Sequence, residues 1–172
     1  MTFVERMVGA ARLDARVFEE VEADSTATPQ ALAVVVLASV ASGLAVGDGV
    51  RGLVVGTVAG LVGWVVWAWL VYFIGTRWLP EPGTRADVGE LLRVIGFATS
   101  PGILRVIGIV PFLSALVLAV TAVWTLVAVV VAARQALDYA STGRAVGVCL
   151  IGWLVQVAIF ALLGLALSRP AW

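Results

Sequence analysis

Five long apolar runs, separated by short polar segments, constrain this chain more than any other feature. A helix of about 20 predominantly apolar residues is long enough to cross the hydrocarbon core of a bilayer. The 172-residue chain is 62% hydrophobic and only 13% charged, whereas a soluble domain is about one quarter charged. The sequence therefore predicts an all-α fold, an integral membrane bundle of five transmembrane helices.

Prolines and capping residues set the expected bounds of these spans. Thr28 followed by Pro29 predicts a helix start, because proline is tolerated in the first turn. Asp87 and Glu90 have the spacing of a capping box, and Pro111 opens the next helix. The predicted spans are 29–46, 51–78, 87–107, 111–134 and 144–168, which form a membrane domain over 29–172 after a cytoplasmic segment, 1–28.

Residues 2–23 are predicted to form an amphipathic helix that lies in the membrane interface. At 100° per residue, apolar side chains such as Phe3 and Phe18 fall on one side, and Glu5 and Arg12 fall on the other. Because the first apolar run begins near Gln30, no cleaved signal peptide is expected.

Acidic residues near the first span raise two separate questions. An acidic cluster consists of Glu19, Glu20, Glu22 and Asp24. Carboxylates this dense could bind a divalent cation, although a solvated helix end is the commoner role and no EF-hand spacing is present. Asp14 falls within the apolar face of the amphipathic helix, where a charge needs a partner, and Arg134 or Arg144 are the expected candidates.

The composition excludes several function classes. The chain has no histidine, no lysine and no asparagine, and its eleven arginines balance eleven acids. A lone cysteine, Cys149, makes neither an internal disulfide nor a metal cage. The aspartates, Asp14, Asp24, Asp48, Asp87 and Asp138, all lie outside the predicted spans. We therefore expect no enzyme activity, no metal, no cofactor and no nucleic-acid partner.

The arginine distribution predicts the orientation. Segments on the side of the N-terminus hold Arg6, Arg12, Arg16, Arg77, Arg85, Arg93, Arg134 and Arg144. The opposite side holds Arg51, Arg105 and Arg169. Because cytoplasmic segments carry the excess of positive charge, the N-terminus is predicted to be cytoplasmic and the C-terminus to be outside.

Small residues recur at intervals of four on the first two spans. The positions are Gly52, Gly56 and Gly60 on the second span and Ser39 and Gly43 on the first. This spacing lets two helix backbones approach closely. Packing within one bundle is the simpler interpretation, and a seam between identical chains is the alternative.

The third span carries two arginines twelve residues apart. Arg93 and Arg105 are separated by about 18 Å of helix, so both reach headgroups only by snorkelling in opposite directions or in a tilted span. The alternative is that one of them holds a lipid phosphate or another anion, or pairs with a buried acid. Glu90 is the expected local partner of Arg93.

Pro101 is predicted to kink this span between the two arginines. It removes one backbone hydrogen bond and frees a carbonyl near Phe97, which Thr99 and Ser100 are positioned to compensate. The predicted anion or lipid-headgroup residues are Arg93, Ser100, Pro101 and Arg105.

Three segments together resemble the Yip domain family, in its prokaryotic branch. They are 18–31 at the entry to the first span, 96–101 (Gly-Phe-Ala-Thr-Ser-Pro) in the third, and 134–145 after the fourth. The resemblance implies a five-helix membrane bundle with a cytoplasmic N-terminus. Eukaryotic members bind Ypt/Rab-type small GTPases and have a longer cytoplasmic N-terminal region. Only about 28 residues precede the first span here, so that role is not carried over.

The leading functional hypothesis is a non-enzymatic, multi-pass protein of a bacterial inner membrane, because the lysine-free composition is typical of GC-rich bacterial genes. It would act as a membrane-organising or adaptor protein, with lipids and a protein partner or a second copy as its contacts. The alternative is a small transporter, channel or lipid-handling protein that uses the kinked third span.

Overall fold

The computed structural model describes residues 1–46 and 49–167, and within them every regular element is helical. Five helices are long and apolar enough to cross a membrane. They cover Ser25–Ala45, Gly49–Trp78, Val88–Ile109, Pro111–Ala136 and Thr142–Leu162. The predicted all-α bundle with five candidate spans is confirmed. Predictions that involve Asp48 and Arg169 lie outside the described residues.

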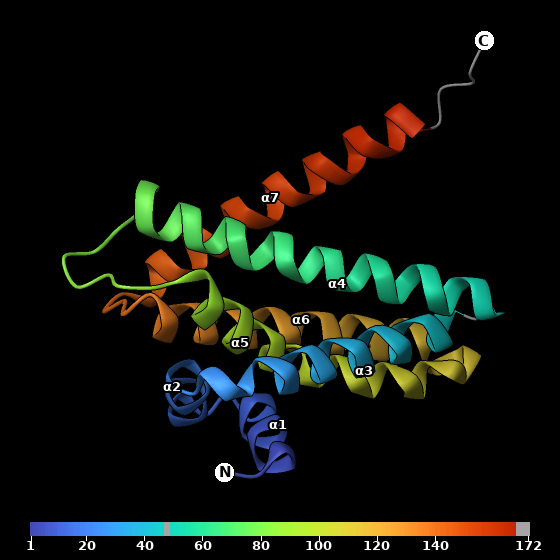
Figure 1. The fold of residues 1–172 in the computed structure, drawn as a ribbon. Coiled ribbons are helices and arrows are strands. Elements are labelled where there is room, and N and C mark those ends of the chain that lie inside the picture. Colours follow the sequence, from blue (N-terminus) through green and yellow to red (C-terminus); the bar gives the residue numbers. More distant parts are fainter. Residues whose placement is uncertain (47–48, 168–172) are drawn as a thin grey trace.

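The spans form two layers (Figure 1). One layer contains α3 (Thr28–Val46), α5 (Val88–Ala98), η3 (Ser100–Ile109) and α6 (Pro111–Ala136). The other contains α4 (Gly49–Phe73), its π-helical end η2 (Ile74–Trp78) and α7 (Thr142–Leu167). Within the first layer η3 lies between α3 and α6, and α7 packs on α4 and α6 before its C-terminal part diverges from the bundle (Figure 1).

The N-terminal segment is two short helices rather than one. α1 (Phe3–Ala11) and α2 (Ala15–Ala23) meet at Leu13, whose φ of 63° lies in the left-handed region and breaks the predicted single helix. Asp14 caps α2 by accepting the Arg16 N–H, and its carboxylate also bonds Arg16 Nη2 at 2.8 Å. The predicted pairing of Asp14 with Arg134 or Arg144 is therefore wrong.

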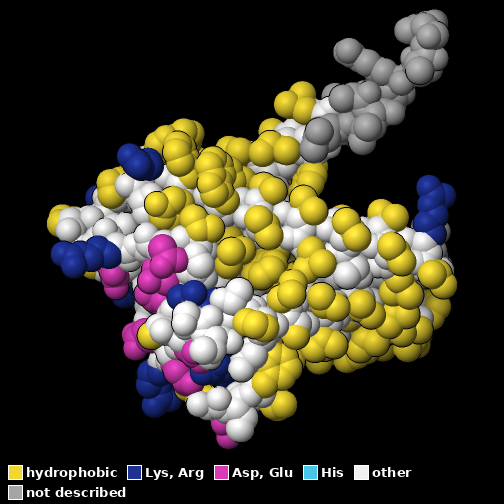
Figure 2. Space-filling view, viewed as in Figure 1, with side chains coloured by type: hydrophobic (Ala, Val, Ile, Leu, Met, Phe, Trp, Pro, Cys, Tyr) yellow, Lys and Arg dark blue, Asp and Glu magenta, His cyan; other side chains and the backbone are white. Residues whose placement is uncertain are grey.

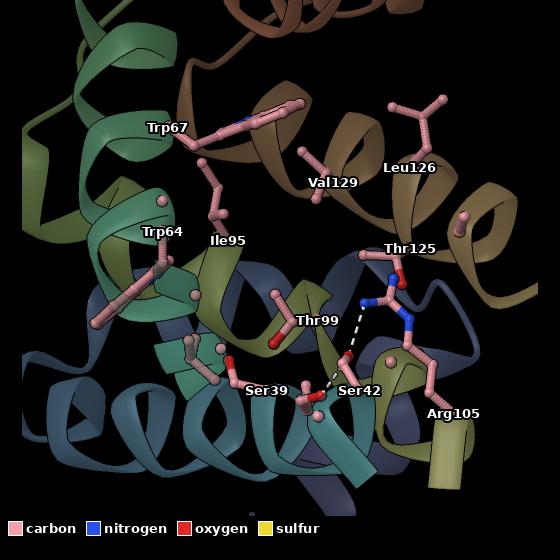
Figure 3. A pocket seen from close by; sticks show the side chains of 18 of the residues that line it. Ser39, Ser42, Trp64, Trp67, Ile95, Thr99, Arg105, Thr125, Leu126 and Val129 are labelled. Atoms are coloured by element: carbon pink, nitrogen blue, oxygen red, sulfur yellow. Dashed lines mark hydrogen bonds between the residues drawn. The ribbon is translucent and has the colours of Figure 1, made fainter. Parts of the chain in front are cut away.

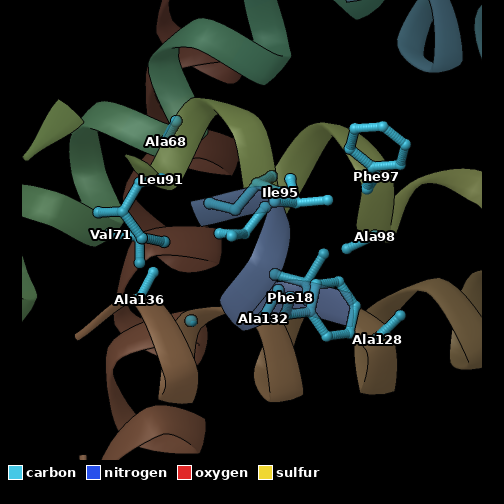
Figure 4. Packing of buried hydrophobic residues seen from close by; sticks show 14 of the residues in the cluster. Phe18, Ala68, Val71, Leu91, Ile95, Phe97, Ala98, Ala128, Ala132 and Ala136 are labelled. Atoms are coloured by element: carbon cyan, nitrogen blue, oxygen red, sulfur yellow. The ribbon is translucent and has the colours of Figure 1, made fainter. Parts of the chain in front are cut away.

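The α1–α2 pair packs on the bundle through aromatic side chains. Phe18 of α2 is fully buried and lies among the small residues Ala98, Ala128 and Ala132 of α5 and α6 (Figure 4). The Trp124 indole N–H of α6 donates to the Ala11 carbonyl at 2.7 Å and so satisfies the end of α1. These contacts attach the N-terminal helices to the membrane domain.

Charge gathers at one end of the molecule. Charged side chains crowd the end that carries α1, α2 and the 79–87 loop, whereas the visible flank of the spans is covered by hydrophobic side chains (Figure 2). This distribution matches a bundle whose long apolar flank faces lipid and whose charged end faces water.

Candidate functional site

The third span breaks in two, and the break positions Arg105. The capping box that starts α5 is confirmed, since Asp87 and Glu90 each accept the other's backbone N–H. Pro101 has no N–H, and Ser100 Oγ donates instead to the Phe97 carbonyl at 2.6 Å. This is the predicted local compensation. The chain then continues as the tighter 3₁₀ helix η3, which carries Arg105 inward between α3 and α6.

Arg93 lies in the interior and binds backbone carbonyls. It is only 8% exposed, and its Nε donates to the Val21 and Glu22 carbonyls at 3.1 Å each, with Nη2 also bonded to Glu22. These are the terminal carbonyls of α2, which otherwise lack partners. Arg93 therefore caps α2. The predicted snorkelling of Arg93 and its pairing with Glu90 are not what the structure shows, since the guanidinium binds these carbonyls in the interior.

Arg105 lies inside the bundle and bonds only hydroxyl groups (Figure 3). Its Nη1 donates to Ser42 Oγ at 3.1 Å and its Nε donates to Thr121 Oγ1 at 3.3 Å. Both hydroxyls donate their own protons to carbonyls of the preceding helical turn, so they are oriented to accept from the guanidinium. Among the described residues Arg105 forms no ion pair, and its Nη2 has no hydrogen-bond partner.

Arg105 lines a groove between the two layers. The groove has a volume of about 1220 Å³, and all five spans contribute to its wall. Its described lining is mostly apolar, with Trp64, Ile95 and Val129 among its larger side chains (Figure 3). Arg51 and Arg105 are the charged residues of this lining, and none of the described lining residues is acidic.

Three buried polar atoms belong to residues of the same groove and have no hydrogen-bond partner in the described part of the chain. They are Trp67 Nε1, Thr125 Oγ1 and Gln156 Oε1. Gln156 is oriented by its amide nitrogen, which donates to the Gly63 carbonyl at 3.2 Å. Thr125 lies one turn from Thr121, on the side of α6 that faces Arg105 (Figure 3). An apolar interior makes unpartnered polar atoms costly, so they are candidates for contact with a ligand.

Ser100 and Pro101 do not belong to this groove. The Ser100 hydroxyl is occupied by the Phe97 carbonyl, and both residues are buried away from the groove lining. The structure therefore gives them no part in the lining of the groove. Their contribution is the break that sets the course of η3.

The small residues of the first two spans lie where α3 approaches α4. A Cβ on Gly60 would collide with the Ser39 side chain, and a Cβ on Gly43 would lie 3.2 Å from the Leu53 Cα. These positions allow α3 and α4 to approach closely, as predicted for packing within one bundle. A Cβ on Gly56 would meet nothing within 4 Å. The Gly52 carbonyl lies 3.6 Å from the same Gly43 position, so Gly56 is the member of the stripe with open space beside it. All of these small residues also line the groove.

The acidic cluster is divided among different partners. Arg6 Nη2 binds Glu20 Oε1 at 2.9 Å and Asp24 Oδ2 at 2.6 Å. The Thr26 hydrogen bond, followed by that of Arg6, lowers the pKa of Asp24 to about 2. Glu19 instead accepts from Gln135 at 2.8 Å. Within the described residues no three acidic side chains are grouped to hold a metal, so the structure does not favour the cation-binding alternative for this cluster.

Glu22, the remaining member, is half-buried beside other acids. Burial, followed by repulsion from Glu90 and Asp138, raises the pKa of Glu22 to about 7. It lies at a small polar pocket with Arg134 and Asp138 at the charged end of the molecule. Glu22 is therefore the member of the cluster whose surroundings oppose its charge most strongly.

Sequence reasoning identified Arg105 but not the groove. In the sequence, Arg51 contributes only to the predicted orientation. Thr125 and Gln156 are polar residues on separate spans, and nothing in the sequence connects them. The one local signal was the i, i+4 spacing of Thr121 and Thr125, which places two hydroxyls on one face of α6. The meeting of this face with η3 and α4 depends on tertiary packing.

Comparison with known proteins identifies the family. Neither the curated proteins nor the solved structures contain a significant match to the chain. The family model of the Yip1 domain matches residues 15–163, which include α2, all five spans and the groove lining. The chain therefore belongs to the Yip1 domain family.

Proposed function

We propose that this protein binds an anionic membrane lipid in the groove, with the lipid head at Arg105. The observation that carries the proposal is an arginine inside the membrane domain that bonds only Ser42 and Thr121. Charged side chains within spans are costly and are retained where they have a functional partner. A phosphate or carboxylate supplies that partner, because ionised oxygens accept strong hydrogen bonds from a guanidinium.

The rest of the groove suits the remainder of a lipid. Trp64, Ile95 and Val129 offer an apolar wall for hydrocarbon. The Arg105 Nη2 donors and the Thr125 hydroxyl lie on the same side of the groove (Figure 3). Binding in this way requires no covalent chemistry, so the proposed role is non-enzymatic.

The proposed setting is a bacterial inner membrane with a cytoplasmic N-terminus. This placement is supported by the excess of arginine at the end that holds α1, α2 and the 79–87 loop. Arg105 and the mouth of the groove near Arg51 then lie in the outer half of the bilayer.

A membrane adaptor is the second candidate function. It is favoured by two exposed arginines, Arg77 just before the 79–87 loop and Arg85 within it, which form no ion pair with the described residues. They offer a cationic surface to a protein partner at the charged end. α1 and α2 are themselves packed on the bundle, so the loop is the better partner-facing surface.

Native mass spectrometry of protein released from lipid nanodiscs tests the lipid-binding proposal. We expect the wild type to retain an anionic phospholipid and Arg105→Gln to lose it, with at least a tenfold drop in the bound fraction. Arg77→Gln is the matched control, because it removes an exposed arginine outside the groove. Retention that does not depend on Arg105 would overturn the proposal and leave the adaptor function as the better account.

A further inference from the structure

The groove carries a second arginine that lipid binding at Arg105 does not by itself require. Arg51 is exposed, lies in the first turn of α4 and lines the same groove. We propose, on the basis of the function proposed above, that Arg51 and Arg105 together select lipids whose head carries two negative charges, such as a phosphomonoester.

A short series of contacts places the two arginines at one region of the groove. Arg105 Nη1 bonds Ser42, and the next residue, Gly43, packs against Leu53 of α4. Leu53 is two residues from Arg51. Arg51 and Arg105 therefore both line the part of the groove where α3 meets the first turns of α4.

The electrostatics of this region favour a doubly charged ligand. None of the described lining residues is acidic, so no protein carboxylate of that lining neutralises either guanidinium. The α4 N-terminus adds the positive end of a helix dipole, and Arg51 extends that field instead of cancelling it. Two cations facing a low-dielectric groove repel each other, and a dianion removes this repulsion more completely than a monoanion does.

A phosphomonoester also offers more acceptor oxygens than a phosphodiester. Arg105 uses Nε and Nη1 on hydroxyl groups and keeps Nη2 for the ligand. Arg51 supplies a second guanidinium, which can bind the remaining phosphate oxygens in a bidentate way. In a phosphodiester one of these oxygens is esterified and carries no charge, so the second arginine gains much less.

The test compares two lipids with identical acyl chains. Phosphatidic acid presents a phosphomonoester, and phosphatidylmethanol presents a phosphodiester with a small methyl cap. At about pH 8 the monoester carries close to two charges and the diester one. Dissociation constants are measured for the wild type, Arg51→Gln, Arg51→Lys and Arg105→Gln, with Arg77→Gln as the control for an arginine outside the groove.

We expect the wild type to prefer phosphatidic acid by about tenfold, which is the effect of one charge-assisted hydrogen bond. Arg51→Gln should reduce that preference to less than about twofold without weakening phosphatidylmethanol binding, and Arg51→Lys should keep most of it because the charge remains. Raised salt should reduce the preference in the wild type.

The experiment distinguishes failure of this inference from failure of the proposed lipid-binding function. Equal binding of the two lipids by the wild type, or a preference that survives Arg51→Gln, would overturn this inference while binding at Arg105 stands. That result would mean that Arg51 contacts bulk headgroups instead of the ligand. Binding of either lipid that is unaffected by Arg105→Gln would overturn the proposed function itself and this inference with it.

Discussion

Glu22 shows how one side chain couples this fold to pH. Its pKa is raised from 4.5 to about 7 by burial, Glu90 and Asp138, with Arg93 opposing them and Glu19 adding to them. Between these values the folded state holds a proton that the unfolded state has lost, so stability falls as pH rises. Below about pH 4 both states are protonated and the cost vanishes.

Glu22→Gln removes this ionisation. Because the side chain is half-buried and solvent screens part of the repulsion, we expect a gain of about 1–2 kcal/mol above pH 7. The gain should disappear at about pH 4. Denaturant unfolding of wild type and variant in the same detergent, at both pH values, measures this difference. Equal stability of the two proteins at high pH would show that Glu22 is solvated in solution.

The two arginines of the third span show what residue-level prediction can and cannot reach. The sequence identifies both as exceptional, because each lies in an apolar span. It does not reveal that the Val21 and Glu22 carbonyls, about seventy residues earlier, are the partners of Arg93. Long-range backbone contacts leave no periodic signal, so the capping role of Arg93 and the open donors of Arg105 look alike in the sequence.

At the scale of the element, the α3–α4 contact depends on some glycines of the stripe and not on others. A Cβ on Gly60 overlaps Ser39, whereas one on Gly56 meets open space. We expect Gly60→Val to destabilise the protein by about 1–3 kcal/mol through overpacking and Gly56→Val to change stability by much less. Thermal unfolding of both variants in one detergent makes the comparison. A larger loss from Gly56→Val would indicate that this position packs against a second copy.

Helix bounds were predictable where a local group sets them. The capping box at Asp87 and the loss of a backbone donor at Pro101 are local effects, and both appear where the sequence places them. The break at Leu13 was not predictable from periodicity, because the residues on either side keep one apolar face. Aspartate is a favoured N-cap residue, so Asp14 could have indicated the start of α2. We instead treated it in the sequence as a charge that needs a distant partner.

For the whole molecule, the hydropathy of the sequence predicts the five-helix bundle but does not predict the groove. The five apolar runs determine the number of spans. A groove forms where neighbouring helices do not pack against each other, and its position cannot be predicted from the sequence of any one helix. Arg51, Arg105 and Gln156 come from three different spans and share a wall only after packing. The family match supports the same fold over residues 15–163 without identifying a ligand.

If a lipid belongs in this groove, the stability of the whole bundle should depend on it. A ligand that binds only the folded state stabilises it by about 2.7 kcal/mol at a hundred times its dissociation constant. For a chain of this size that corresponds to a rise in Tm of about 5–10 °C. We expect this rise when phosphatidic acid is added to delipidated wild type and to Arg77→Gln, and no rise for Arg105→Gln. Equal shifts in all three proteins would mean that the lipid acts as a general solvent for the spans. A shift that requires Arg105 would mean that the two helical layers are held together in part by the ligand between them, because the groove lies at their junction.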